Sequence, residues 1–168
     1  VLSDEEKAGG IEKLKAEAKR VSDKLRKQMK TEEAHRVTVM ADELTEEWGE
    51  LSMYAGMDAF LSYFFDERVG LLDYFKPSDS LIFFDELTRC VEQGKLTETE
   101  FSESMKQRLA MGYILPGQMN GLFTEKEIVA KLEKYSCIAL GALDNKANGL
   151  HQLGSYGIHC QSVSPYNN

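Results

Sequence analysis

The sequence predicts a helix-rich α/β fold with a small, mostly parallel sheet and a long N-terminal helix. Apolar residues at helical spacing in the first thirty positions predict the helix. Four consecutive apolar residues, LIFF at positions 81–84, predict a strand covered on both faces, as in a parallel sheet. With 168 residues and 42% hydrophobic content, the chain can fill one domain core. We expect residues 1–168 to form one unit, with a long helix in residues 1–36 and an α/β part in residues 37–168.

The N-terminal helix is expected to run from Ser3 to about residue 30. Ser3 and Glu6 have the spacing of a capping box, in which each residue bonds the other's backbone N–H. A narrow apolar stripe follows at spacings of three and four: Ile11, Leu14, Ala18, Val21, Leu25 and Met29. Gly9 and Gly10 are expected to loosen the first turns. Acidic residues are interleaved with the lysines along this helix, which argues against a helix that binds nucleic acid.

Residues 31–65 are expected to continue as shorter helical pieces that are rich in aromatic side chains. The aromatic residues of this run are Trp48, Tyr54, Phe60, Tyr63, Phe64 and Phe65. A run this aromatic is more often core than a ligand-binding site, so we expect it to supply much of the core. The weaker alternative is a helical interaction domain that uses the same run as a docking face.

The later segments alternate between strand and helix signals. A short apolar turn, LLDYF, and a break around Pro77 precede the strand, and a helix is expected from Glu86 to about residue 111, with a possible break near Gly94. A loop surrounds residues 116–117. Thr124 and Glu127 form a second capping-box pattern for a helix to about residue 134. Further strands are expected near residues 136–143 and 157–164.

Charge and cysteine content exclude several classes of function. The net charge is −8; residues 1–36 carry ten Lys/Arg against eight Asp/Glu, and the remainder carries ten against twenty, so no broad basic face for duplex DNA is expected. No apolar run is long enough for a membrane span, and we expect a soluble, cytoplasmic protein. Cys90, Cys137 and Cys160 suggest neither disulfides nor a zinc site, and we expect reduced, mostly buried thiols. The histidines lack metal-ligand spacing, and His159 is expected to pack on a strand.

The run LIFFDE has the form of a magnesium-binding strand in a nucleotide hydrolase. Asp85 at the strand end would hold hydrated Mg²⁺, and Glu86 would polarise the attacking water. Such chemistry also needs a phosphate-binding loop, GxxxxGK[ST], which the sequence lacks. The alternative, which we favour over a catalytic role, is that Asp85 caps the following helix and Glu86 complements its positive end.

The pattern GLLDYF-x5-LIFFDELTR, at residues 70–89, resembles the N-terminal part of the bacterial transcription-repair coupling factors (Mfd). The resemblance continues through the acidic helical segment LTETEFSESMKQRL, the loop YILPGQ and the tail SVSPYNN, and it covers most of the chain. The family motif corresponds here to Leu71, Leu72, Asp73, Tyr74 and Arg89. The long N-terminal helix matches the family only in general helical character.

The resemblance implies the second half of a helicase-like, UvrB-like α/β domain that follows a UvrA-binding insertion. It identifies Asp85 and Glu86 as a degenerate Walker B-like pair, although Leu87 stands where the family more often has Pro. We therefore expect a fragment of a larger protein with no enzymatic activity, cofactor or bound metal of its own. The parent would use ATP and Mg²⁺ in a separate motor to translocate on DNA.

The implied partners are the other domains of the parent chain, and the parent would bind RNA polymerase, UvrA and duplex DNA. No membrane partner is expected. A half-domain leaves an apolar sheet face or edge exposed, so we expect the isolated chain to be able to dimerise. The alternative is half of an ATP-dependent helicase domain that supplies Asp85 and Glu86 to a phosphate-binding loop elsewhere in the parent.

Overall fold

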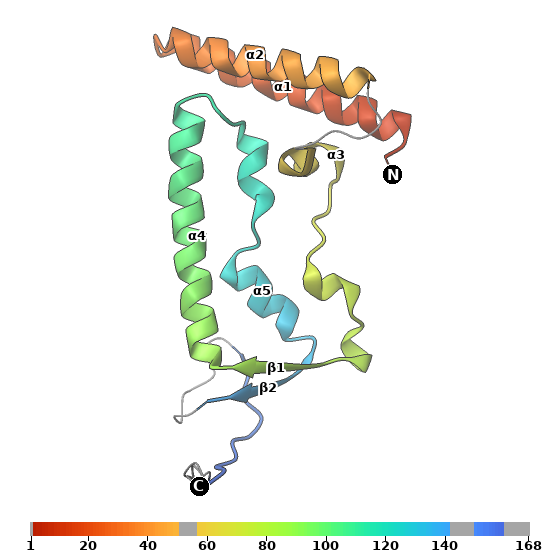
Figure 1. Ribbon diagram of the computed structural model, residues 1–168, viewed down its shortest axis with the longest axis vertical. Coiled ribbons are helices and arrows are strands. Elements are labelled where there is room, and N and C mark those ends of the chain that lie inside the picture. The colour runs from red at the N-terminus through yellow and green to blue at the C-terminus, as the bar shows by residue number, and fades with distance from the viewer. Residues whose placement is uncertain (1, 51–56, 142–149, 160–168) are drawn as a thin grey trace, which may run out of the picture.

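The computed structural model describes residues 2–50, 57–141 and 150–159 and shows an elongated arrangement (Figure 1). A hairpin of two long helices lies across one end, a two-stranded sheet lies at the other, and a third long helix runs between them along one side. The α-helices are α1 (Asp4–Lys27), α2 (Thr31–Glu50), α3 (Leu61–Phe64), α4 (Leu87–Ala110) and α5 (Glu125–Leu132). The strands are β1 (Leu81–Asp85) and β2 (Ser136–Leu140). The 3₁₀ turns are η1 (Met57–Phe60), η2 (Leu71–Tyr74), η3 (Pro77–Asp79) and η4 (Pro116–Gly121). The predicted helix-rich fold with a small parallel sheet is confirmed.

Helix α1 begins where the sequence predicts, with the Ser3–Glu6 capping box formed in both directions. It ends at Lys27, three residues before the expected end near residue 30, because Met29 takes a left-handed backbone conformation with φ 64°. The N–H of Lys30 then bonds the Leu25 carbonyl at 3.0 Å, which closes the helix end. Met29, expected on the apolar stripe, is therefore outside the helix and exposed.

Helix α2 is one continuous helix of 20 residues, so the expectation of shorter helical pieces is wrong for residues 31–50. It packs antiparallel to α1 as a hairpin, and this packing supplies the tertiary burial that sustains a long helix. The core shared by this hairpin and the adjoining segments consists of Leu14, Ala18, Leu25, Ala34, Val37, Ala41, Trp48, Phe60, Tyr63, Phe64 and Leu115.

The aromatic run forms core, as predicted. Trp48 is fully buried and meets the rings of Phe60 and Phe64 edge-on, with centroid distances of 5.2 and 5.4 Å. Phe65 is the exception, because 44% of its surface is exposed. Tyr54 lies outside the described residues. The burial of Trp48 argues against the alternative in which the run is a docking face.

Helix α1 passes through Gly9 and Gly10 without a break. The two glycines differ in their surroundings: a Cβ on Gly9 would meet nothing within 4 Å, whereas a Cβ on Gly10 would lie 2.1 Å from the Phe64 ring. Gly10 is therefore a point where the helix backbone comes close to an aromatic ring, and the absence of a side chain permits the packing.

Polar contacts join the helical hairpin to the rest of the chain. The Glu17 carboxylate accepts a hydrogen bond from the Gly117 N–H at 2.9 Å and one from the Tyr63 hydroxyl. Burial, followed by the hydrogen bond to Glu17, raises the pKa of the Tyr63 phenol. Arg36 donates to the Met111 carbonyl at 2.9 Å from the other helix of the hairpin. These bonds fix the hairpin against both the α3 and the α4 ends.

Helix α4 runs unbroken past Gly94 over its 24 residues, and α5 begins at the predicted Thr124–Glu127 capping box. The sheet pairs β1 with β2 in parallel, with Phe83 opposite Ile138. A strand expected at 157–164 is not formed at residues 157–159, and the remainder of that range lies outside the described residues. His159, expected to pack on that strand, is exposed. Within the described ranges, no helix has both the length and the apolar character needed to cross a membrane.

Candidate functional site

The acidic pair lies where strand β1 passes into helix α4. Asp85 is the last residue of the strand and is exposed. Glu86 occupies the N-cap position in a left-handed conformation, with φ 56° and ψ 59°, and its side chain makes no capping hydrogen bond. The N–H of Glu86 donates to the Leu140 carbonyl at 2.8 Å, which extends the sheet by one bond. The prediction that Asp85 is the N-cap residue of α4 is therefore wrong. Glu86 holds that position, and its side chain makes no capping hydrogen bond.

The surroundings of the pair bear on metal binding. In the part of the chain that the structure describes, no three His, Cys, Asp or Glu side chains lie together in a way that could hold a metal ion. Arg89 is exposed on the first turn of α4. Asp85 and Glu86 thus form a two-carboxylate strand end that would need further ligands from a phosphate or another segment to hold Mg²⁺.

The cysteines differ from the expectation of buried thiols. Cys90, one turn into α4, is exposed, and its Sγ lies 3.5 Å from the Asp85 carbonyl oxygen. Cys137 on β2 is partly buried, and this desolvation raises the pKa of its thiol. Cys160 lies outside the described residues. The exposure of Cys90 follows from its place on the outer side of the first helical turn.

The GLLDYF segment contains a short 3₁₀ turn, η2, which is held in place by Gly70, by Lys131 of α5 and by Tyr135. The Gly70 N–H donates to the Asp73 carboxylate at 2.7 Å, and Lys131 of α5 forms an ion pair with the same carboxylate. The Gly70 hydrogen bond, and next to it the Lys131 bond, hold the pKa of Asp73 below its usual range. The Tyr135 hydroxyl bonds the carbonyls of Leu72 and Phe75 at 2.5 and 3.0 Å. Asp73 therefore has a structural role in the turn.

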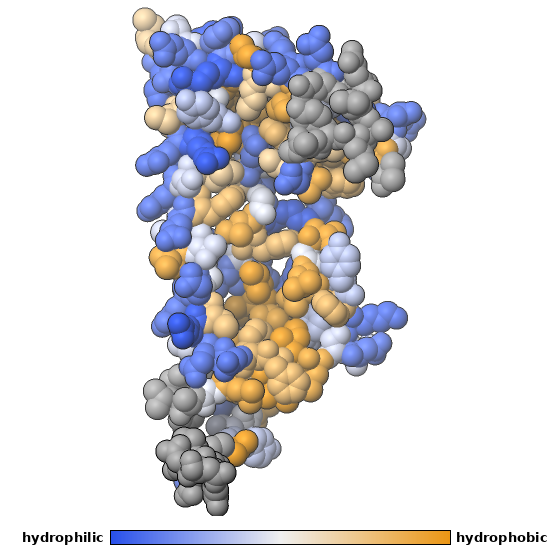
Figure 2. Space-filling model, viewed as in Figure 1, coloured by the Kyte–Doolittle hydropathy of each residue, from blue (hydrophilic) through white to orange (hydrophobic). Residues whose placement is uncertain are grey.

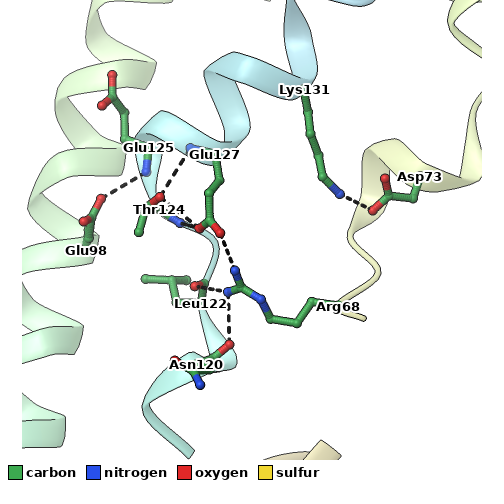
Figure 3. A network of polar contacts seen from close by, with 9 residues as sticks. All are labelled: Arg68, Asp73, Glu98, Asn120, Leu122, Thr124, Glu125, Glu127 and Lys131. Atoms are coloured by element: carbon green, nitrogen blue, oxygen red, sulfur yellow. Dashed lines mark hydrogen bonds and ion pairs between the residues drawn. The ribbon is translucent and has the colours of Figure 1, made fainter. Parts of the chain in front are cut away.

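Figure 3 shows the second set of contacts that fixes this segment. Arg68 donates to the carbonyls of Asn120 and Leu122, at 3.1 and 2.8 Å, and pairs with Glu127. Glu127 also accepts from the Thr124 N–H at 2.8 Å, and that bond is the main cause of its lowered pKa. These partners come from segments more than fifty residues apart in sequence, which no local pattern could reveal.

Two cations of this network lie against one aromatic ring, that of Phe123. The Arg68 guanidinium and the Lys131 ammonium each lie 4.6 Å from the centre of the Phe123 ring. A Cβ on Gly70 would lie 3.0 Å from the same ring. The turn η2 is therefore held against α5 by charge, hydrogen bonds and contact with the partly buried Phe123 ring.

The outward side of this region is apolar. We define the apolar surface as Leu71, Tyr74 and Phe75 of the turn with Leu81, Phe83, Ile138 and Leu140 of the strands. Leu71 and Tyr74 are 77% and 79% exposed, and Phe83 is 61% exposed. The parallel register places Phe83 beside Ile138 on one face of the sheet. Figure 2 shows hydrophobic side chains gathered over the end of the molecule that holds α5, η2 and the sheet.

The expectation that β1 is covered on both faces is wrong for the described residues. Its exposure alternates along the strand, with Leu81, Phe83 and Asp85 exposed and Ile82 and Phe84 partly buried. Each strand has one neighbour in the part of the chain that is described, so the sheet also has two unpaired edges there. The strand is apolar on both sides but covered on only one.

Comparisons with protein-family models and with curated proteins find no match to this chain.

Proposed function

We propose that the chain is a non-catalytic structural and regulatory part of the UvrB-like module of a transcription-repair coupling factor. In this proposal the parent displaces stalled RNA polymerase from DNA lesions by ATP-driven translocation and recruits UvrA for nucleotide excision repair in the cytoplasm. The observation that carries it is the uncovered parallel sheet, because the GLLDYF-x5-LIFFDELTR pattern runs through turn η2 and strand β1 into the first turn of α4.

The physical argument concerns what such a sheet requires. Parallel sheets occur almost entirely with both faces covered, and two strands alone are marginal in water. Here Leu81 and Phe83 are 52% and 61% exposed on the face beside Ile138. Contiguous exposed apolar side chains of this kind mark a surface that another unit covers. Half of an interrupted α/β domain has these properties, with the missing strands and cover supplied by other parts of the parent.

The non-catalytic assignment rests on the acidic pair and the missing phosphate loop. Asp85 and Glu86 are at the end of a parallel strand, but the sequence has no GxxxxGK[ST] run to hold a triphosphate. Titration calorimetry with Mg-ATP should therefore give no binding heat. ATP turnover by the purified chain would overturn the assignment.

The alternative, half of an ATP-dependent helicase domain, is favoured by one observation. Asp85 is exposed at the carboxyl end of β1, where ligands of open α/β sheets bind. Under this alternative, Asp85→Asn in the full parent protein abolishes ATP hydrolysis that depends on this domain. Under our proposal, the same substitution leaves the ATPase activity of the separate motor unchanged.

The half-domain assignment is tested by the association of the chain with itself. We expect sedimentation velocity to show a concentration-dependent dimer formed through the apolar surface. Leu81→Ser should shift the chain toward monomer, whereas Leu96→Ser on α4 should not; the two leucines are 52% and 50% exposed, which makes the control well matched. A wild-type chain that is monomeric at all concentrations would count against the half-domain.

A further inference from the structure

The first helix carries a concentration of positive charge that the whole-chain balance conceals. Between Lys13 and Lys30 the sequence has eight Lys/Arg and only two Asp/Glu, in a protein of net charge −8. An asymmetry of this size in one short segment is typical of a surface that meets a polyanion. The acids that interleave with these lysines in the sequence were the reason to expect no such surface.

The structure shows that both of those acids are engaged with other groups. Glu17 turns toward the interior, where its carboxylate accepts from the Gly117 N–H and the Tyr63 hydroxyl and pairs with Arg20. Asp23 lies 3.8 Å from Arg26. Glu17 is thus withdrawn from the outward side of α1, whereas Asp23 stays exposed there and offsets the charge of Arg26.

Four exposed cations form what we call the cationic ridge: Lys15, Lys19, Arg26 and Lys27. At 3.6 residues per turn, Lys15, Lys19 and Arg26 lie within about 40° of one another around the helix axis, and Lys27 lies about 80° beyond Lys19. Among the described residues, these three lysines have no ion pair. Glu12 flanks the N-terminal end of the ridge.

A groove runs beside the ridge between α1 and α2. It has a volume of about 290 Å³, and Lys15, Lys19 and Arg26 line it together with the carboxylates of Asp23 and Asp42. The cations thus stand at the rim of a concave surface. At a rise of 1.5 Å per residue the ridge is roughly 18 Å long, which matches about five phosphates of one DNA strand.

We propose that the cationic ridge binds the phosphate backbone of duplex DNA without sequence preference. Charge complementarity supports this: unpaired lysines on an otherwise acidic protein release counterions from DNA, and the acidic remainder keeps the contact weak and local. The choice of duplex DNA among polyanions rests on the proposed function, in which the parent moves along DNA. The ridge itself does not depend on that proposal.

The test uses the full chain and a fluorescein-labelled 20-base-pair duplex of arbitrary sequence, with anisotropy measured from 25 to 200 mM KCl. If the three lysines of the ridge each neutralise one phosphate, affinity falls roughly 40-fold between 50 and 200 mM salt. The variant Lys15→Gln/Lys19→Gln/Lys27→Gln should lower the salt slope by about three and greatly weaken binding. Circular dichroism establishes that each variant remains helical.

The matched control is Lys76→Gln/Lys106→Gln/Lys126→Gln, which removes the same charge from exposed lysines away from α1. It should retain nearly all of the affinity of the wild type. Equal losses in the two triple variants, or no binding by the wild type at 25 mM salt, would overturn the proposal. Stronger binding to poly-glutamate than to DNA would overturn it in favour of an acidic protein partner. None of these outcomes bears on the sheet, so the half-domain assignment stands or falls separately.

Discussion

The neighbouring glycines of α1 allow packing strain to be separated from helix propensity. Alanine at either position should stabilise the helix by about 1 kcal/mol relative to glycine. At Gly9 nothing opposes this gain, because a Cβ there meets nothing within 4 Å. At Gly10 the Cβ would lie 2.1 Å from Cδ1 and 2.8 Å from Cγ of Phe64, and that ring is buried against Trp48. The strain of such overpacking is about 1–3 kcal/mol.

Because helix propensity contributes equally to both variants, the difference between them isolates the strain. We expect Gly9→Ala to raise the free energy of unfolding by up to about 1 kcal/mol and Gly10→Ala to fall about 1–3 kcal/mol below it. Urea unfolding followed by circular dichroism measures this, and with a slope of about 2 kcal/mol/M the midpoints should differ by roughly 0.5–1.5 M. Indistinguishable midpoints would show that the Phe64 ring moves aside without cost, which would refute the close packing.

Two further predictions concern other polar contacts. Glu17→Met should lower the free energy of unfolding by about 1–3 kcal/mol, because it removes the acceptor of the part-buried Tyr63 hydroxyl and leaves the Gly117 N–H with only the longer, 3.2 Å bond to that hydroxyl. Glu12→Met, an exposed site on the same helix, should change the free energy of unfolding by less than about 0.5 kcal/mol in urea titrations. Because the pKa of Asp73 is lowered in the folded protein, its contacts stabilise the fold fully above the unfolded-state pKa of 3.8. This stabilisation is lost as the pH falls through the lower folded-state pKa. Asp73→Asn should therefore make stability fall less between pH 5 and 3, and an unchanged pH dependence would show that the Gly70 and Lys131 contacts are weak in solution.

Local signals in the sequence predicted the elements that depend on local interactions. The capping boxes at Ser3 and Thr124 form as predicted because both partners are three residues apart. The strand at LIFF forms at its apolar run and pairs in parallel as expected, although the cover on both faces from which the pairing was predicted is not present in the described residues. The length of α2 was missed because its continuity depends on packing against α1, with which it shares a buried core.

The candidate site was predictable in composition but not in arrangement. Asp85 and Glu86 were found from their place after the strand, yet the left-handed backbone at Glu86, which puts the N-cap there, has no signature in the residue types. Arg68 and Glu127 are 59 positions apart, so their contact depends wholly on the tertiary fold. The exposure of Phe83 is likewise set by what does or does not cover the sheet, which a strand's own sequence cannot specify.

The buried core is unevenly distributed, and this determines which parts of the chain unfold locally. Most buried apolar side chains lie around the helical hairpin, whereas α4, α5 and the sheet contribute only Leu87, Val91 and Leu132 among the described residues. Local unfolding requires the least free energy where few apolar contacts must be broken. Amide hydrogens of β1 and β2 should thus exchange with solvent through small local fluctuations, while those of α1 and α2 exchange only when the whole chain unfolds. The end that carries the GLLDYF and LIFFDE segments is then the end whose backbone can adjust when another unit packs on the apolar surface, as we propose.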